Sequence, residues 1–313
     1  MSDSSSKVSI YAALLANVAI AIAKFVGAGI SGSSAMLSEG IHSVVDSVNE
    51  ILLLYGLKQS EKGPDDLHPL GHGQELYFWS LVVAVLIFSL GGGFSIYEGI
   101  QGFQAAEPSA SPVVSYSVLG TAAIFEAAAL TVSIREFKHQ NPNRQGNLWT
   151  AMKRSKDPSS FIVIFEDAAA LLGLGVAFGG VYLSQVTQNT TYDAVASIII
   201  GVILTVVAIV LVSETKGLLI GESALPETQE SLKAIIKADQ AVVGMGSLIT
   251  LHLAPKDVML ALNIEFADDL SADDIEAAVR RIETSIRDSH GEVKRIFIEA
   301  ASMRLTAQSA AKE

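Results

Sequence analysis

Apolar residues in the first two thirds of the chain gather into six long runs separated by short polar stretches. A helix rises 1.5 Å per residue, so about 20 apolar residues cross the ~30 Å hydrocarbon core of a bilayer. The pattern therefore predicts six transmembrane helices. They cover roughly Val8 to Ile30, Gly32 to Leu57, Glu75 to Ile100, Pro112 to Ile134, Ser159 to Leu183 and Tyr192 to Val212.

The pattern changes after Lys216, where long apolar runs give way to short alternating and helical patterns. Helix, strand, strand, helix and strand are predicted in that order, which favours a compact α+β domain with one sheet face covered. We expect a membrane domain over 1–220, the α+β domain over 221–306 and a disordered tail over 307–313. The five predicted elements cover 231–238, 247–253, 258–266, 272–288 and 293–299.

The connections between the apolar runs differ in charge. Those after the second and fourth runs contain Lys and Arg, and the other three contain neither. The positive-inside rule then places both termini and the two basic loops in the cytoplasm. The longer basic loop, 135–155, could instead bind anionic lipid headgroups, at about 1 kcal/mol per basic residue. Short loops and the lack of a targeting segment favour a prokaryotic inner membrane.

Composition supports a membrane protein, since 50% of residues are hydrophobic and only 17% are charged. A soluble domain averages about 25% charged residues. The absence of cysteine excludes disulfides and thiolate metal sites. A net charge of −12 argues against a nucleic-acid partner. The first apolar run is too long for a signal-peptide core, so we interpret it as a retained helix.

Ionisable residues interrupt the second apolar run. His42 and Asp46 are four residues apart and therefore share one helix face. Such groups are costly in hydrocarbon and usually mark a pathway or a binding site. Imidazole plus carboxylate suits a divalent transition metal such as zinc. The alternative is a buried histidine–carboxylate pair that only ties two helices together.

The fifth run carries Glu166 and Asp167 among alanine and glycine residues. Small residues let helices approach closely in a membrane. If the second and fifth helices pack together, His42, Asp46 and Asp167 converge as three metal ligands near mid-membrane. Because metal binding requires deprotonated ligands, such a site exchanges metal for protons. A purely structural polar network is again the alternative.

A second candidate metal site lies in the first basic loop. Asp65, His68 and His72 place one carboxylate and two imidazoles within eight residues. Pro69 and Gly71 predict a turn there instead of a helix. Three such side chains can share one cation. Surface histidines in loops usually bind nothing, and that alternative stays open.

Two stretches carry a resemblance to a known family. Gly32-Ser-Ser-Ala-Met-Leu-Ser-Glu-Gly-Ile-His-Ser43, with Lys24 before it and Asp46 after it, resembles the opening signature of the cation diffusion facilitator family. Asp65-Asp-Leu-His-Pro-Leu-Gly-His-Gly73 is similar to that family's loop after the second helix. The resemblance implies a homodimer that exports divalent cations, most often zinc, from the cytoplasm in exchange for protons.

The resemblance also implies where cations bind. An (Asp/His)-x-x-x-Asp pair on the second helix corresponds to His42 and Asp46, and Asp167 matches the second carboxylate of the fifth-helix pair. A further site falls on Asp65, His68 and His72.

The sequence departs from the family pattern at three points. Val163 stands where the partner of Asp167 is expected, and Glu166 or Glu39 are the candidates for a fourth ligand. Gln74 replaces a frequent lysine after the loop. The C-terminal domain has only His252, His290 and scattered acids in place of a histidine-rich site.

The expected fold is a membrane all-α six-helix transmembrane bundle with a C-terminal cytoplasmic α+β (ferredoxin-like) domain. The expected function is proton-coupled export of a divalent cation, with zinc first and iron(II), cobalt or manganese behind it. We expect partners to be the bilayer, a second copy of the chain, metal cations and protons. A membrane enzyme is disfavoured because no His-Glu-x-x-His motif is present. A membrane metal sensor is the less favoured alternative.

Overall fold

The computed structural model describes residues 2–103, 112–140 and 147–300, with side chains described from residue 17 onward except at 112 and 140. The predicted tail, 307–313, lies outside these residues. The chain divides into two compact units. The first, here called the membrane unit, comprises Met1–Gln59 and Glu75–Lys216. The second unit comprises Ser60–Gln74 and Gly217–Glu313, so the first basic loop belongs to it.

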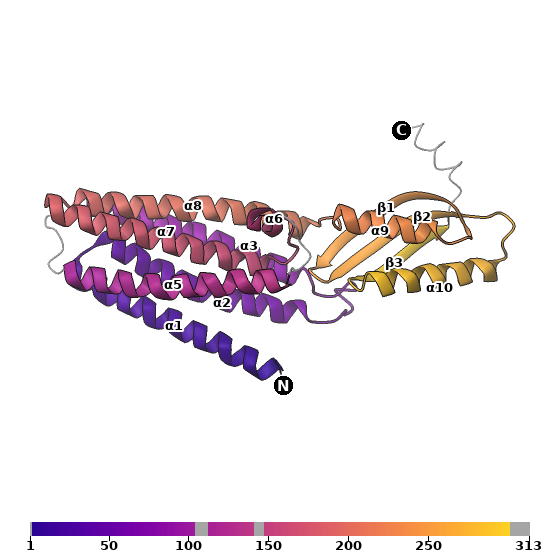
Figure 1. Ribbon diagram of the computed structural model, residues 1–313, viewed down its shortest axis with the longest axis horizontal. Coiled ribbons are helices and arrows are strands. Elements are labelled where there is room, and N and C mark those ends of the chain that lie inside the picture. The colour runs from indigo at the N-terminus through magenta and orange to yellow at the C-terminus, as the bar shows by residue number, and fades with distance from the viewer. Residues whose placement is uncertain (1, 104–111, 141–146, 301–313) are drawn as a thin grey trace, which may run out of the picture. The chain divides into compact units, whose positions relative to one another are not determined.

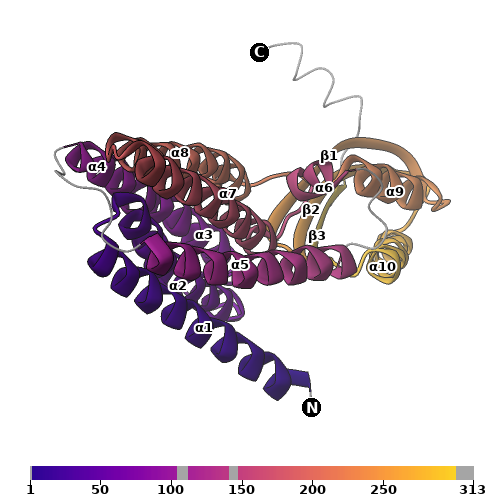
Figure 2. The same ribbon diagram turned by 60° about the vertical axis from the view of Figure 1, so that its left-hand side comes forward.

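The membrane unit is helical (Figures 1 and 2), and its helices follow the predicted apolar runs. The third run forms one continuous helical segment with a π-helical stretch in its middle, and a short extra helix, α6, lies in the second basic loop. The elements are α1 (Ser2–Ser31), α2 (Ser34–Ser60), α3 (Glu75–Leu86), η1 (Ile87–Gly92), α4 (Gly93–Gly102), α5 (Pro112–Gln140), α6 (Leu148–Lys153), α7 (Pro158–Thr187) and α8 (Thr191–Ile220).

Four of the described helices are long and apolar enough to cross a membrane: Glu75–Gly102, Val113–His139, Pro158–Thr187 and Thr191–Ile220. They coincide with the predicted runs three to six. The described apolar part of α1, Asn17–Ser31, is shorter, and α2 is not among the four. Four of the six predicted runs thus have the length and composition of membrane spans, which supports an integral membrane protein.

The boundary between α1 and α2 has a local cause. Gly32 adopts a left-handed conformation, with φ of +67°. Its backbone N–H donates to the carbonyl of Ala28 at 2.8 Å. Glycine tolerates this conformation without a Cβ penalty and commonly ends a helix in this way. The chain therefore breaks where the first two apolar runs were predicted to meet.

The second unit contains a three-stranded sheet in the order β1–β2–β3, with β1 and β2 antiparallel and β2 and β3 parallel. The predicted order of elements is the observed one. Both α9 and β1 begin five residues earlier than predicted, because Pro226 starts the helix and the glycines in 242–246 obscure the strand pattern. The elements are α9 (Pro226–Lys237), β1 (Val242–Ala254), β2 (Asp257–Phe266), α10 (Ala272–Ser289) and β3 (Val293–Ala300).

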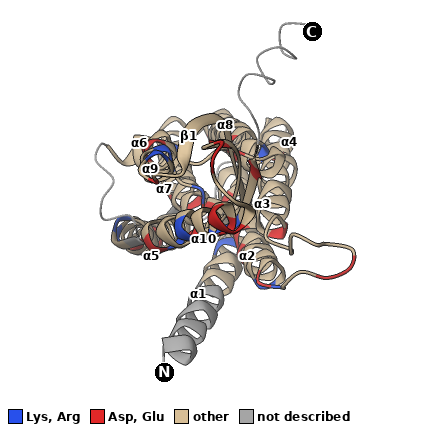
Figure 3. Cartoon of the chain, turned by 90° about the vertical axis from the view of Figure 1, so that its right-hand side faces the viewer, with Lys and Arg blue, Asp and Glu red and all other residues tan. Residues whose placement is uncertain are grey.

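One face of this sheet packs on the two helices. Alternate residues of β2 are buried, as the period of a strand requires. Ile282 and Ile286 of α10 and Leu232 of α9 cover them. A capping box at Ser271 and Asp274 starts α10, and the charged residues of that helix include both signs (Figure 3). An apolar cluster thus fills the space between the sheet and the two helices.

Candidate metal centres

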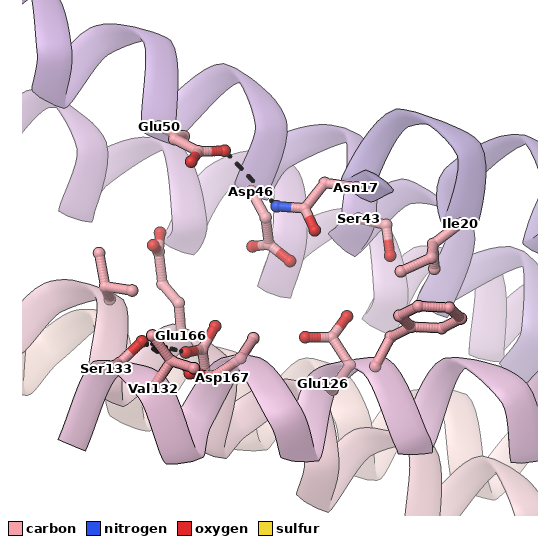
Figure 4. A pocket seen from close by; sticks show the side chains of 13 residues that line it. Asn17, Ile20, Ser43, Asp46, Glu50, Glu126, Val132, Ser133, Glu166 and Asp167 are labelled. Carbon is pink, nitrogen blue, oxygen red and sulfur yellow. Dashed lines mark hydrogen bonds between the residues drawn. The ribbon is translucent and has the colours of Figure 1, made fainter. Parts of the chain in front are cut away.

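A cavity of about 340 Å³ opens inside the membrane unit (Figure 4). Four helices, α1, α2, α5 and α7, contribute its walls. Its lining combines carboxylates, hydroxyls and an amide with apolar side chains. The lining residues are Asn17, Ile20, Ser43, Asp46, Glu50, Phe125, Glu126, Ala129, Val132, Ser133, Val163, Glu166 and Asp167.

Five carboxylates line this cavity: Asp46 and Glu50 from α2, Glu126 from α5, and Glu166 and Asp167 from α7. The lining carboxylates on the three helices face a common space (Figure 4). Uncompensated carboxylates are expensive in a low-dielectric interior, and a bound cation removes that penalty. The cavity therefore has the chemistry of a cation-binding chamber.

His42 and Asp46 lie together on α2, as their spacing predicted. The imidazole Nδ1 is 3.3 Å from Asp46 Oδ1, and the His42 side chain is only 1% exposed. The contact has the distance of an ion pair without hydrogen-bond geometry, so both ring nitrogens and Oδ1 lack a hydrogen-bond partner. An unsatisfied buried polar group costs about 1–3 kcal/mol. These atoms are chemically suited to coordinate a metal.

Asp167 also lines the cavity, on the opposite side from α2 in Figure 4. Its Oδ2 accepts a hydrogen bond from the Ser133 hydroxyl of α5 at 2.8 Å. His42, Asp46 and Asp167 do not form a group with all ligand atoms within 4.8 Å; among the described residues only the loop cluster below meets that criterion. The hydrogen bond to α5 holds Asp167 in this separated position.

Val163 and the two candidates for a fourth ligand, Glu166 and Glu39, differ in their surroundings. Val163 lines the cavity, so that position faces the space although its side chain cannot coordinate. Glu166 also lines the cavity, but its Oε1 accepts from the Asn49 amide at 2.7 Å. Glu39 is fully buried outside the lining, and its Oε2 lies 3.1 Å from Lys24 Nζ.

The Lys24–Glu39 pair is a second buried charged feature of this unit. Both side chains are 0% exposed, and Lys24 Nζ also donates to the Ser43 hydroxyl at 2.8 Å. Since Ser43 lines the cavity, the ammonium lies one hydrogen bond from it. The pair joins α1 to α2. Its Lys24 ammonium places a positive charge beside the carboxylate cluster of the cavity.

Sequence reasoning missed Glu126 and Ser133 of α5. Glu126 lies inside the fourth apolar run, and the rule that marks intramembrane ionisable residues as functional would have found it. Ser133 carried no signal, because a serine inside an apolar helix usually donates to its own backbone.

Asp65, His68 and His72 form a compact cluster in the loop of the second unit. Asp65 Oδ1 is 3.1 Å from His68 Nδ1, and Asp65 Oδ2 is 2.9 Å from His72 Nε2. One ligand atom from each residue lies within 4.8 Å of the other two. A carboxylate and two imidazoles at this separation are a donor set that zinc accepts.

The loop places these three side chains through its own backbone. Asp65 Oδ1 accepts from the backbone N–H groups of Leu67 at 3.0 Å and His68 at 2.6 Å. Hydrogen bonds from His72, and then from the His68 backbone, hold the pKa of Asp65 well below its usual range. The carboxylate is therefore ionised, which is the form that binds metal.

The loop is also attached to the sheet of its own unit. Arg295 of β3 donates through Nη2 to the Leu70 carbonyl at 2.8 Å and through Nη1 to Asp257 at 2.6 and 2.7 Å. Gly73 passes so close to β1 that an added Cβ would lie 2.6 Å from the Leu253 carbonyl oxygen. Backbone of this loop and the sheet thus position the cluster together.

The histidines of the C-terminal elements have other contacts. His290 Nε2 is 2.8 Å from the Ser231 hydroxyl, and its Nδ1 is 3.3 Å from Glu292. His252 Nδ1 is 3.3 Å from the Ala254 carbonyl. Neither belongs to a three-ligand group within the part of the chain that the structure describes.

Comparison with known proteins assigns both units. Residues 10–220 match the cation efflux transmembrane domain, and residues 224–300 match the cytoplasmic domain of cation efflux proteins.

Three relatives illustrate the range of similar proteins. The proton-coupled zinc antiporter SLC30A9, mitochondrial, of Xenopus laevis is 31% identical over 86% of this chain and 55% of its own length. Metal tolerance protein C4 of Arabidopsis thaliana is 31% identical over 85% of this chain and 58% of its own length. The manganese efflux system protein MneP of Bacillus subtilis is 25% identical over 91% and 92%. The chain thus spans a little over half the length of the first two.

Proposed function

Because the chain belongs to the cation diffusion facilitator family, whose members are transporters and not enzymes, we propose that it exports a divalent transition-metal cation, zinc before others. The observation that carries this proposal is the cavity between α1, α2, α5 and α7 with its five carboxylates. An intramembrane chamber lined by metal-ligand side chains is what a cation needs in order to cross hydrocarbon.

In the proposed cycle, His42, Asp46 and Asp167 bind the cation inside the cavity. The unsatisfied nitrogens of His42 and Oδ1 of Asp46 support their role as ligands. Asp167 exchanges its hydrogen bond with Ser133 for the metal, which brings the α7 side of the site toward α2. Protons then displace the metal after the cavity opens outward, since the ligands bind metal only when deprotonated. Binding therefore alternates between metal and protons, as in antiport.

The proposed topology has six spans, with α1 and α2 joining the four helices that qualify by length and composition. The charge of the loops supports cytoplasmic termini. We assign 1–220 to the transport domain, 221–306 to a cytoplasmic domain of the ferredoxin-like type and 307–313 to a tail. A prokaryotic inner membrane is the proposed location. The bacterial relative supports it, whereas SLC30A9, of higher identity, is named as mitochondrial.

Asp65, His68 and His72 are proposed as a second cation site, on the cytoplasmic side. Its exposed side chains, 53% for His68 and 51% for Asp65, allow an ion to arrive directly from water. Its lowered carboxylate pKa supports metal capture without prior loss of a proton from Asp65. In this proposal the loop receives cytoplasmic cations, and the cavity moves them.

We propose a homodimer assembled through the uncovered face of the sheet. Ile249, Ala261 and Phe297 lie in register across the three strands. Ile249 is 58% exposed and Phe297 is 54% exposed, on the face opposite the helices. A continuous apolar row on a solvent-accessible sheet face is a suitable contact for a second copy.

Manganese is the second candidate cargo, ahead of iron(II) and cobalt. The cavity offers five carboxylates and one adjoining imidazole, and oxygen-rich sites suit manganese better than zinc. The relative MneP, named as a manganese efflux protein, supports this alternative. Zinc keeps the first place because His42 contributes a nitrogen and because SLC30A9 is named as a zinc antiporter.

The test is metal flux in proteoliposomes under an imposed pH gradient. Wild type, Asp46→Ala and Asp167→Ala are compared with zinc, manganese, iron(II) and cobalt. We expect flux in wild type that follows the pH gradient and is lost in both variants. Glu98→Gln is the matched control, because Glu98 is a carboxylate of α4 outside the cavity lining.

Absence of flux of all four metals in wild type would contradict the export proposal and favour a metal sensor. Flux that ignores the pH gradient would leave export intact and rule out proton antiport.

A further inference from the structure

We propose that Glu126 of α5 is a cation ligand of the transport site and supplies the carboxylate that Val163 does not. This inference rests on the proposed function, because it extends the donor set of the same cavity. It adds a third helix to the site, beyond α2 and α7. The donor set then becomes the imidazole of His42 and three carboxylates.

The first support is that Glu126 is buried and has no hydrogen-bond or ion-pair partner among the residues that the structure describes. Its side chain lines the cavity and the residue is 9% exposed. No hydrogen bond or ion pair joins it to any described residue, whereas each of the other four lining carboxylates has a partner. Three of these partners donate hydrogen bonds: Asn17 to Glu50, Asn49 to Glu166 and Ser133 to Asp167. For Asp46 the partner is the His42 ring, at ion-pair distance without hydrogen-bond geometry.

The second support is the direction in which the Glu126 side chain points. Figure 4 shows the Glu126 carboxylate pointing from α5 into the open space below Asp46 and Ser43. Ala129, three residues further along α5, also lines the cavity, and its small side chain leaves room beside Glu126. Ser133, seven residues from Glu126, lies on the same face two turns away and holds Asp167. One face of α5 therefore carries both a carboxylate without a described hydrogen-bond partner and the hydroxyl that contacts a predicted ligand.

The third support is that the two other candidate carboxylates already have partners. Glu39 is bound to Lys24 and lies outside the cavity lining, and Glu166 already accepts from Asn49. Recruiting either one breaks an existing interaction, and leaving its partner buried and unpaired is costly. Recruiting Glu126 breaks none. A buried carboxylate without a donor gains most from a bound cation.

This assignment has a consequence for selectivity. A third carboxylate raises the share of oxygen donors in the site, and oxygen donors favour manganese over zinc relative to imidazole. Glu126 is then the residue that widens the range of cations accepted. Its removal weakens manganese binding more than zinc binding.

The experiment measures zinc and manganese flux in proteoliposomes for wild type, Glu126→Gln and Glu126→His. For Glu126→Gln we expect the half-saturating zinc concentration to rise at least about tenfold, and manganese to be affected more strongly. Glu126→His offers a nitrogen ligand, so zinc flux returns toward the wild-type value while manganese flux stays low. Glu98→Gln, outside the cavity, is expected to match wild type for both metals.

Unchanged half-saturation for both metals in Glu126→Gln overturns the proposal. Equal loss of zinc flux in Glu126→Gln and Glu126→His also overturns it, because a merely structural carboxylate is not replaced by imidazole. Either result leaves the export function standing as long as wild type transports metal. Absence of flux in wild type is instead the failure of the proposed function itself.

Discussion

The membrane unit and the second unit differ in how deeply they bury charged side chains. The membrane unit buries Lys24, Glu39 and His42, each no more than 1% exposed. The second unit buries only Thr250 and His252 among its described polar residues, and its charged pairs, such as Asp239 with Arg281, lie nearer the surface. All eight described buried side-chain atoms without a hydrogen-bond partner belong to the membrane unit.

This difference supports the proposal that the membrane unit gives up stability for cation binding. Buried polar groups are nearly always hydrogen-bonded, and each exception needs an explanation. In the membrane unit, four of the eight atoms belong to Glu39, His42 and Asp46, which surround one region of α2. In the proposed site, the lone pairs of His42 and Asp46 gain a partner when a cation binds. The second unit has the pattern of a domain selected for folding and association.

The two candidate metal centres repeat the contrast. The loop cluster is compact, exposed and already linked through Asp65. The cavity residues come from four helices, and His42, Asp46 and Asp167 do not form a compact ligand group. A compact site binds without rearrangement. A dispersed site requires helices to move as the ion binds, which is the property that alternating access uses.

The largest expected effect separates the two centres. Asp46→Ala removes a proposed ligand of the transport site and should lower flux at least about 100-fold, since losing even an outer-shell partner costs 10–100-fold. Asp65→Ala should leave flux measurable and remove one equivalent of bound metal from the purified protein. Flux assays and equilibrium metal titration measure the two quantities. Equal loss of flux in both variants would show that the centres do not act separately.

The second effect tests the buried charge of the membrane unit. Lys24→Met leaves Glu39 buried and unpaired, and breaking such a pair costs about 3–5 kcal/mol. Adding Glu39→Gln should recover most of this loss, because the uncompensated charge is removed. Unfolding of the full chain in detergent measures the change, with the exposed Lys58→Met as control. If Lys24→Met alone were as stable as wild type, the Lys24–Glu39 pair would contribute nothing to the stability of the fold.

A smaller effect concerns the attachment of the loop to the sheet. Arg295→Ala removes the hydrogen bond to the Leu70 carbonyl, so the loop cluster loses positioning while keeping all three ligands. Zinc affinity at the loop should fall about tenfold, as for an outer-shell partner. Titration in the Asp46→Ala background isolates this site. Arg287→Ala, on α10, is the control, and an equal fall there would rule out a specific role for Arg295.

The smallest effect is the pH response of the second unit. Hydrogen bonds from Arg281 hold the pKa of Asp239 below its usual value. A lowered folded-state pKa adds stability above the unfolded pKa of about 3.9, and this is lost as pH falls through the folded pKa. Asp239→Asn should therefore destabilise the second unit by less than about 1 kcal/mol at pH 6, because Arg281 is largely exposed. At a pH below the folded-state pKa of Asp239, the substitution should have no effect on stability. Hydrogen exchange of the β1 and β2 amides, corrected for intrinsic rates, measures this. Asp268→Asn is the control, and an equal loss at every pH would contradict the assignment.

Short-range patterns in the sequence determined much of this protein. Apolar runs predicted the long helices, and alternation predicted the order of elements in the second unit. Residues four apart on α2 predicted the contact of His42 with Asp46, observed at 3.3 Å. The Asp65, His68 and His72 cluster followed from its short spacing and turn residues. In each case the chain separation is small, so local geometry dictates the outcome.

Only the tertiary structure decided how distant segments meet. It brought Glu126 of α5 to the cavity, paired Lys24 with Glu39, turned Glu166 toward Asn49 and attached the first basic loop to the sheet through Arg295. These contacts depend on how each helix is rotated about its own axis and on which neighbour it packs against. A single apolar run does not encode that rotation, because lipid and helix neighbours are almost equally apolar.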